Sequence, residues 1–584
     1  MKPHSALALT SLLFAALMCV LPFLVPHHRN PLTTFYGEWM AVALGLAASA
    51  LLLRRVSWQP FRLPVVALVP LGLMVVLGVQ VAAGLAVYWQ QHFLVGLYLM
   101  WAALMVVLGA ELRREFGLEK VTPALACAVL AGGFLSALVV GIQLSGIDLA
   151  PYVIPRKAAR YGANLMQVNH LANYLGLALA SLLYLAATAR IKTGVAAMLA
   201  IVLLFSLALT GQRMGWIYVV MLAVGFWWAG RKANKSSWRA LWLIPAFMAL
   251  QLIIPLLTIG GAPAMATQKV VQGFPGPSIR LQFIREAWDI FMTHPWLGAG
   301  WGQFGWQDFL LADVYPDHKS WTSHAHNLIL QLLAETGLAG VLTLLAGLGL
   351  WARHAVTAQL NAERWWLYAL LGVLGVHTLL EYPLWYAYFL GLFALLLGMA
   401  DENPVQVRLD LGPVMAGAVT LFGAISLFNL GINYAKLEDW YTRGKVGRMA
   451  AAEIDGMFEE MGKMRHKSLL TPYIDLVVVR ALPDTPQFIA DKLTINGQVM
   501  RFRPGDAETY NHATLLAFSG RPAEAQKQLQ RAIVRHPGYV DIYGMQLLKP
   551  SHPETLPLVM TIVRHNRAMY GYDKKSGGQK ADSR

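Results

Sequence analysis

His324 and His326 stand directly before a long apolar segment, where side chains that exchange protons would meet the membrane surface. Asn327, Gln331 and Glu335 follow at four-residue spacing, which places them along one face of a helix that enters the bilayer. A carboxylate inside a membrane helix is costly and usually functional, and histidine can act as a general base at neutral pH. The two histidines could also bind zinc, but no third ligand follows at the spacing of a zinc protease.

Three arginines offer a second kind of chemistry, the binding of phosphate. Arg213 lies in a very short connection between two apolar segments, so its guanidinium is expected at the membrane edge. Arg280 opens a predicted short helix on the outer surface, and Arg285 follows within it. A guanidinium matches phosphate oxygens in pairs and stays charged. The alternatives are an arginine that anchors a helix end and an interfacial helix with solvated arginines.

A polar cluster opens the sixth apolar segment, which begins near residue 171. Gln167, Asn169 and His170 precede it directly. Amide side chains in membranes commonly form hydrogen bonds between helices. The cluster by itself therefore leaves a structural and a functional role open.

A further pair lies near the end of another apolar segment. His377 precedes Glu381 by four residues, so the two share a helix face and could form an ion pair, and Tyr382 follows directly. Such a pair could be a structural contact at a helix end or a part of the site.

Membrane helices must position these residues. Of the 584 residues, 57% are hydrophobic and 14% are charged, whereas about 25% are charged in soluble domains. A span needs roughly 20 apolar residues, and about thirteen such segments are expected. They start near residues 6, 38, 64, 93, 122, 171, 193, 215, 240, 328, 365, 384 and 411. We therefore predict an all-α polytopic body over residues 1–433 and a helical domain over residues 434–584.

The distribution of Lys and Arg predicts the orientation of the spans. These residues are dense in alternate loops such as 53–62, 113–120 and 231–239, and such loops face the cytoplasm. Thirteen spans then leave the N-terminus in the cytoplasm and the C-terminal domain in the periplasm of a bacterial inner membrane. The long loops 144–170 and 260–327 lie on the periplasmic side and are expected to form the site. The net charge of +15 follows largely from this topology and requires no nucleic acid.

The C-terminal domain contains a pattern of small residues. Ala513, Gly520, Ala525 and Ala532, followed by Pro537, fit one tetratricopeptide-like helix pair. One repeat cannot bury its apolar face alone, so neighbouring helices must complete it. An ordinary helical domain is the alternative.

Four segments, taken in order, resemble the O-antigen ligase superfamily, and most closely its bacterial O-oligosaccharyltransferases, the pilin-type protein glycosylation ligases. His324 to Gly337 is similar to the His-Asn and Glu-x-Gly signature of the superfamily. Gln167 to Ala172 resembles a Gln-Pro-Asn-His-Leu-Ala motif, with valine in place of proline. His294 to Phe304 and Glu381 to Tyr386 resemble two further segments. The resemblance covers roughly residues 160–400.

This resemblance implies a GT-C-type fold, an undecaprenyl-diphosphate-linked glycan as donor, two arginines on the pyrophosphate and a histidine near the acceptor. The corresponding residues are Arg213, Arg280 and His326, although Arg285 stands near Arg280. The other polar residues singled out above would support them: Gln167, Asn169, His170, His324, Asn327, Glu335, His377, Glu381 and Tyr382.

The chemistry expected from these residues is a single in-line displacement that inverts the anomeric centre. No Asp-x-Asp pair stands in the outer loops, so arginine is expected to replace metal, and no cofactor is expected. The acceptor would be a serine or threonine hydroxyl of an exported protein such as pilin, and membrane lipids would surround the body.

Two other readings stay open. An enzyme of the same superfamily could ligate O-antigen to lipid A-core or polymerise a glycan. A polysaccharide transporter would also explain many spans and buried charges, but the inverted repeats that would support it are not visible in the sequence.

Overall fold

The computed structural model describes most of the chain, and the structural statements below concern that part. The described residues are 6–55, 58, 60–156, 161–232, 237–257, 265, 268, 279–355, 357–402, 404–445, 451–482, 485–548 and 552–570. Helices dominate them, and the one described sheet has two short strands. The predicted all-α polytopic membrane protein is confirmed.

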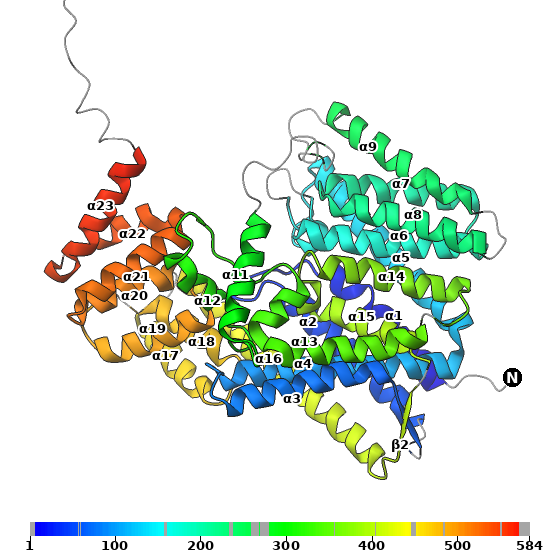
Figure 1. Ribbon diagram of the computed structural model, residues 1–584, viewed down its shortest axis with the longest axis horizontal. Coiled ribbons are helices and arrows are strands. Elements are labelled where there is room, and N and C mark those ends of the chain that lie inside the picture. Colours follow the sequence, from blue (N-terminus) through cyan, green and yellow to red (C-terminus); the bar gives the residue numbers. More distant parts are fainter. Residues whose placement is uncertain are drawn as a thin grey trace, which may run out of the picture.

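The membrane body is a bundle of long apolar helices (Figure 1). Among the described residues, nine helices are long and apolar enough to cross a bilayer. They are α1 with the following turn (Ala6–Leu24), α2 (Phe35–Leu52), α3 with the preceding turn (Val65–Ala82), α4 (Trp89–Phe116), α5 (Leu118–Ser145), α6 (Val168–Ala187), α9 with the preceding turn (Trp238–Leu256), α13 (Leu328–Ala355) and most of α16 (Gly412–Lys445).

Four further helices occupy the remaining apolar segments. They are α7 (Thr193–Leu209), α8 (Met214–Lys232), α14 (Ala362–Thr378) and α15 (Ala387–Ala400). The chain breaks at Pro383, where a short 3-10 turn separates α14 from α15, because proline cannot continue a helix. Each expected apolar segment thus coincides with a helix, while the number that cross the membrane stays a prediction.

Contacts between loops sort the ends of the bundle into two groups. At one end, strand β1 (Phe61–Leu63) pairs antiparallel with β2 (Val405–Val407). Arg113 and Arg364 both form ion pairs with Glu402 at this end. These loops belong to the set that is rich in Lys and Arg, so their proximity agrees with the predicted alternation.

The opposite end joins the N-terminal loop to the start of the C-terminal domain. Tyr434 donates to the carbonyl oxygen of Leu32 at 2.7 Å, and His27 lies 2.6 Å from Glu438. Helix α16 continues without a break through residue 433. The domain boundary drawn there therefore falls inside one helix, which belongs to both parts.

The C-terminal helices gather at one end of the bundle (Figure 1). They are α17 (Ala451–Arg465), α18 (Thr471–Ala481), α19 (Ile489–Phe502), α20 (Asp506–Phe518), α21 (Pro522–Arg535), α22 (Val540–Leu547) and α23 (Leu556–Tyr570). Helices α20 and α21 pack together where the helix pair is predicted, and Ala513, Ala525 and Ala532 are buried between helices. The assignment to the tetratricopeptide class stays a prediction.

Candidate active site

Glu381 lies at the centre of the candidate active site. One of its carboxylate oxygens is 3.0 Å from Nη2 of Arg280, and the other is 2.8 Å from Nδ1 of His326. Arg280 belongs to α11 (Ile279–Thr293), His326 precedes α13, and Glu381 follows α14. The fold thus joins three candidate residues from separate parts of the chain.

The charge on Glu381 orients the imidazole of His326. Burial alone would raise the pKa of Glu381, but the hydrogen bond from His326 and the charge of Arg280 hold it below its usual range. A carboxylate accepts hydrogen bonds, so Nδ1 of His326 carries the shared proton. The second ring nitrogen, Nε2, is then the basic atom that could take a proton from a substrate.

The ring of His326 is held between two aromatic side chains. Phe283 of α11 stacks on it, with ring centroids 5.4 Å apart and planes 12° apart. Tyr382 meets it edge-on at 5.2 Å. Asn327 accepts from the backbone N–H of Leu330 and donates to the carbonyl oxygen of Leu379, at 2.9 Å. Asn327 therefore ties the start of α13 to the end of α14, and so brings His326 to Glu381.

His324 faces a different environment from His326. It is partly buried, and its ring stacks on Tyr382, with centroids 4.1 Å apart. Burial lowers its pKa to about 3, and the neighbouring His326 contributes to the shift. His324 is therefore neutral near pH 7 and acts as an aromatic support for Tyr382.

Glu335 organises a glycine-rich turn. Its carboxylate accepts from the backbone N–H of Phe304 at 3.1 Å. The backbone of α13 also departs from helical geometry at Gly337, where φ is 61°. A Cβ on Gly337 would lie 2.5 Å from the backbone of Trp296, so only glycine fits. Glu335, the last residue of the polar stripe predicted on α13, thus holds the segment 294–304.

Gln80 of α3 completes this arrangement from the opposite side. Its amide nitrogen donates to the carbonyl oxygens of Leu297 and Glu335, both at 2.7 Å, and its amide oxygen accepts from the N–H of Trp301 at 3.2 Å. One buried amide therefore binds three backbone groups of the kink and the turn, and the carbonyl oxygen of Glu335 also accepts from the N–H of Gly300.

The two other candidate arginines differ in position. Arg213 is exposed in the turn before α8, at the same end of the bundle as Glu381. The hydrogen bond between Tyr218, near the start of α8, and Nδ1 of His377 shows that the two lie at the same end. His377 lies in the last turn of α14, just before Glu381. Arg285 is also exposed, but it lies near Tyr315 on another face of α11 than Arg280.

The remaining candidates are Gln167, His170, His377 and Asn169, and the first two contact tyrosines that follow Glu381. Gln167 interacts with Tyr382, and the buried ring of His170 packs edge-on against Tyr386 at 4.4 Å. The spacing of His377 and Glu381 left an ion pair between them open, and the ion pairs of the described residues do not include it. Glu381 binds Arg280 and His326 instead, and the ring of His377 bonds Tyr218. Asn169 is partly buried on the first turn of α6, and the described contacts of the site do not include it.

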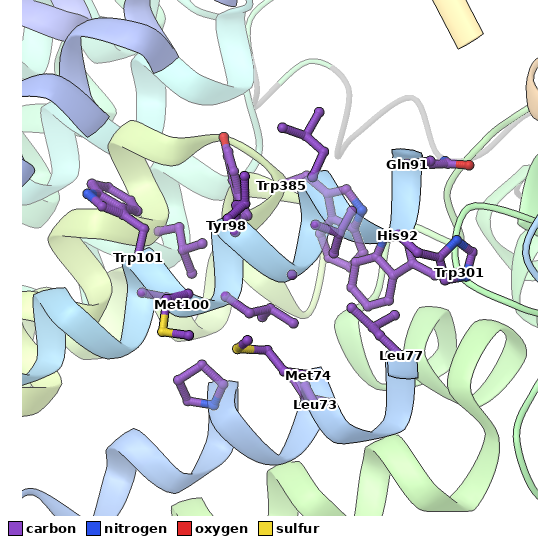
Figure 2. Close-up of a pocket in the computed structure, with 18 of the residues that line it drawn as sticks. Leu73, Met74, Leu77, Gln91, His92, Tyr98, Met100, Trp101, Trp301 and Trp385 are labelled. Atoms are coloured by element: carbon purple, nitrogen blue, oxygen red, sulfur yellow. The ribbon is translucent and has the colours of Figure 1, made fainter. Parts of the chain in front are cut away.

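A large apolar cavity reaches the site from the membrane body (Figure 2). Its volume is about 1130 Å³, and helix α4 contributes more of its wall than any other element, with further residues from α2, α3, α13, α15 and α16. Leu73, Met74 and Leu77 line one side, while Trp301 and Trp385 face it at the end nearest the site. His324 also lines it. Tyr382 stacks on His324 and also contacts His326, so these two rings connect the cavity wall to His326.

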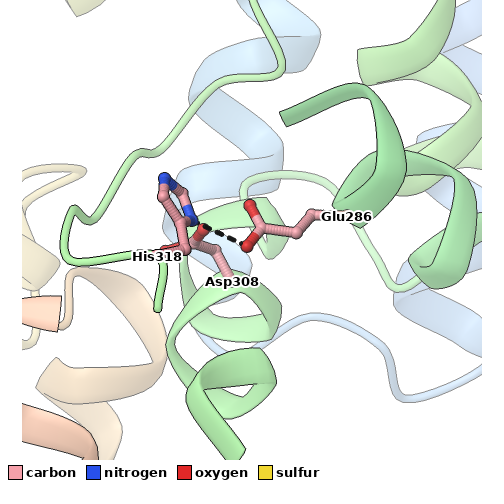
Figure 3. A group of neighbouring side chains, drawn as sticks. All are labelled: Glu286, Asp308 and His318. Atoms are coloured by element: carbon pink, nitrogen blue, oxygen red, sulfur yellow. Dashed lines mark hydrogen bonds and ion pairs between the residues drawn. The ribbon is translucent and has the colours of Figure 1, made fainter. Parts of the chain in front are cut away.

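Three further side chains form a polar group outside the region just described (Figure 3). Glu286 of α11, Asp308 of α12 (Phe304–Leu310) and His318 each offer an atom that could bind a metal, and these atoms lie within 4.8 Å of one another. Burial raises the pKa of Asp308 well above its usual range, and Glu286 raises it further. The guanidinium of Arg535 lies 3.0 Å from Glu286 and supplies positive charge to the group.

Comparisons with known proteins agree with this arrangement. Residues 197–345 match the O-antigen ligase family, and residues 365–541 match the C-terminal part of a virulence factor membrane-bound polymerase. The chain is 29% identical over 438 residues to a general O-oligosaccharyltransferase of Acinetobacter baylyi, covering 71% of this chain and 74% of the relative. It is 22% identical over 401 residues to a ComP-specific O-oligosaccharyltransferase of the same organism, covering 68% and 72%.

The helical body, the polar site at its end and these matches define a membrane-bound glycosyltransferase of the O-antigen ligase superfamily. Within this superfamily the chain is similar to two O-oligosaccharyltransferases.

Sequence reasoning missed four residues with clear roles in this geometry. Phe283 stands one helical turn after Arg280, so its position beside the site could have been inferred from that spacing. Gln80 is a lone amide in an apolar span, which is a signal for a buried hydrogen bond. Tyr218 and Arg535 make contacts across more than 150 residues of sequence. No local pattern indicates those contacts.

Proposed function

We propose that the enzyme transfers an oligosaccharide as one unit from an undecaprenyl-diphosphate carrier to serine or threonine hydroxyls of periplasmic proteins such as pilin. The observation that carries the proposal is the bridge of Glu381 between Arg280 and His326. This bridge sets a group suited to phosphate beside a group suited to proton abstraction.

The arginines would serve the donor. As the bond between the anomeric carbon and the pyrophosphate oxygen breaks, its electron pair stays on that oxygen. A fixed guanidinium stabilises such developing charge, most strongly where water is scarce. Arg280 is half-exposed and Arg213 is exposed at the same end of the bundle, so both are accessible to a pyrophosphate. The apolar cavity supports a substrate that carries a hydrocarbon chain.

His326 would serve the acceptor. Its Nε2 takes the proton of the hydroxyl as the hydroxyl oxygen attacks the anomeric carbon, and Glu381 stabilises the imidazolium that forms. The attack is in line with the leaving pyrophosphate, so the configuration at the anomeric carbon inverts. The helix pair α20–α21 stands at the end of the bundle that carries the site and supports a protein acceptor, because such helix pairs commonly bind peptides.

Mutation of His326 tests the division of roles. His326→Ala should abolish transfer to a co-expressed pilin, measured by intact-protein mass spectrometry, while a lipid-linked glycan still binds. His354→Ala is the matched control. This exposed histidine lies in the last turn of α13, whereas His326 lies just before the first turn of that helix. Full activity of the His326 variant would contradict its role as the base.

Chelation tests the absence of metal chemistry. Transfer should continue in excess EDTA, because arginines supply the positive charge in the proposed mechanism. Loss of activity that Mg²⁺ or Mn²⁺ restores would contradict this, and would point to Glu286, Asp308 and His318 as the metal ligands.

A second candidate function is glycan polymerisation or ligation of O-antigen to lipid A-core. The match of residues 365–541 to a membrane-bound polymerase and of residues 197–345 to the O-antigen ligase family favours it. An unchanged pilin mass, together with restored O-antigen on lipid A-core or longer glycan chains in a strain lacking its own enzyme, would establish this function instead.

A further inference from the structure

Arg535 is a completely buried arginine whose charged partners lie outside its own domain. It ends α21 in the C-terminal helices, and its guanidinium donates to Glu286 at 3.0 Å. It also donates to the carbonyl oxygens of Asp308 and His318, each at 2.9 Å. One side chain thus binds helix α11, helix α12 and the loop that follows α12.

The cost of burying a charge makes this contact favourable only while the C-terminal domain is docked, with α21 against the segment 279–327. Burying an ion requires compensating hydrogen bonds and opposite charge. Arg535 finds both only while α21 lies against the segment 279–327. Withdrawing α21 would leave the buried Glu286 without its cation. The hydrogen bonds and the ion pair of Arg535 therefore form together when the C-terminal domain docks, and they break together when it leaves.

A short path leads from Arg535 to His326. His318 lies 2.9 Å from Glu286 and packs against the ring of Phe283 at 5.4 Å. Phe283 in turn stacks on His326. Helix α11 therefore carries, on successive turns, Arg280, then Phe283, then Glu286, the contact with the C-terminal domain.

A metal ion is the other explanation for the group of Glu286, Asp308 and His318. Three of their polar atoms have no hydrogen-bond partner among the described residues. However, the guanidinium of Arg535 already lies within 3.0 Å of both Glu286 and His318. It would repel a divalent cation at that position. The protein itself supplies the cation.

We propose that Arg535 is a positioning residue through which the docked C-terminal domain holds α11, and with it Phe283 and Arg280, against His326. The inference rests on the proposed function, because it assigns α11 to the donor side of that reaction.

The test compares Arg535→Met with Arg531→Met in the full-length enzyme. Arg531 lies one turn earlier on α21 and binds Asp313 of the same body segment, but it does not contact α11. Arg535→Met should lower kcat at least about 10-fold and raise the KM for the lipid-linked donor, with the KM for the acceptor within about twofold. Arg535→Lys should recover part of kcat. Arg531→Met should stay within about twofold of wild type throughout.

Hydrogen exchange supplies a readout that does not depend on activity. Amides of residues 279–293 should exchange faster in Arg535→Met than in Arg531→Met, while amides of α4 and α15 should keep their protection. Unchanged exchange in α11, or a raised acceptor KM with unchanged kcat, would overturn the proposal and leave the domain as an acceptor dock only. If wild-type protein fails to transfer glycan, the proposed function fails, and the exchange experiment still decides whether Arg535 holds α11.

Discussion

At the scale of single residues, Glu381 links two side chains of different chemistry, Arg280 and His326. It holds His326 by one oxygen and Arg280 by the other, so displacement of either partner changes the environment of the other. His324, only two residues from His326, is excluded from this exchange by burial and stacks on Tyr382. Two histidines that stand only two residues apart in the sequence thus have different roles, because their surroundings differ.

Arg280 and Arg285 should respond differently to mutation. Arg280→Ala should lower the rate of transfer about 100-fold or more, because removal of one fixed donor to a developing oxyanion typically costs that much. Arg280→Lys should recover little, since an ammonium cannot copy the paired geometry of guanidinium. Arg285→Ala should stay within about threefold. Transfer assays with purified enzyme and lipid-linked glycan check this, and a dead Arg285 variant beside an active Arg280 variant would contradict it.

His324 should make the folded protein sensitive to acid. Its pKa falls from an ordinary value of 6.5 to about 3 in the folded state. The unfolded chain therefore binds the extra proton between these values, and folding stability falls as pH falls from about 6.5 toward 3, by up to about 1.4 kcal/mol per pH unit. His324→Phe keeps an aromatic ring and removes the titration. Its melting temperature in detergent should drop less than that of wild type between pH 7 and pH 5.

The sequence predicted much of the candidate site at this scale. The positions of His326, Arg280 and Glu381 in motifs suggested one site, and the structure brings those three side chains together. The sequence also left a pairing of Glu381 with His377 open, because four-residue spacing on a helix indicates that two residues share a face and says nothing of competing partners from other helices.

At the scale of elements, the glycine-rich turn and the kinked helix α13 form one unit. The backbone N–H groups of Ala299 and Gly300 donate to the carbonyl oxygens of Ala334 and Glu335. The irregular backbone of α13 at Gly337 is thereby paired with protein rather than left unsatisfied in the membrane. His326 lies just before α13, so the rigidity of this unit contributes to the position of the proposed base.

Gln80→Leu tests that unit. The substitution keeps the approximate size of the side chain, and it leaves the carbonyl oxygen of Leu297 without its donor and the N–H of Trp301 without its acceptor. An unsatisfied buried polar group costs about 1–3 kcal/mol, so the unfolding free energy should fall by about 2–4 kcal/mol. The melting temperature and kcat should fall together. Gln90→Leu, at a partly buried position in α4, should change neither, and equal behaviour of the two variants would contradict the role of Gln80.

The helices themselves were predictable because an apolar run of about 20 residues is a local signal. The break at Pro383 was predictable for the same reason. The turn that Gln80 holds was not, since its hydrogen bonds join α3 to segments more than 200 residues away.

At the scale of the whole molecule, loop contacts fix which ends of the helices lie together. The β1–β2 pairing and the ion pairs of Glu402 gather one set of loops. The contacts of Tyr434 and Glu438 gather the other. An even number of crossings must therefore separate Leu63 from Val405, as the alternation of charged loops requires.

Reporter fusions determine which end faces the periplasm. A reporter placed after Ala400 should be active in the cytoplasm, because the neighbouring loops are rich in Lys and Arg. A reporter placed after Arg465, beyond α17, should be active in the periplasm. Alkaline phosphatase and fluorescent-protein fusions measure this directly. The reverse pattern would move the candidate site to the cytoplasmic side and contradict the proposed donor and acceptor.

The burial of Arg535 against α11 and α12 also constrains how such enzymes can be recombined. A chimera that exchanges only the C-terminal helices between two relatives would set a foreign α21 against a resident Glu286, Asp308 and His318. A working exchange must therefore carry residues 279–323 together with α20 and α21, although about 180 residues separate them in the chain. The segments that must be exchanged together are therefore discontinuous in the gene.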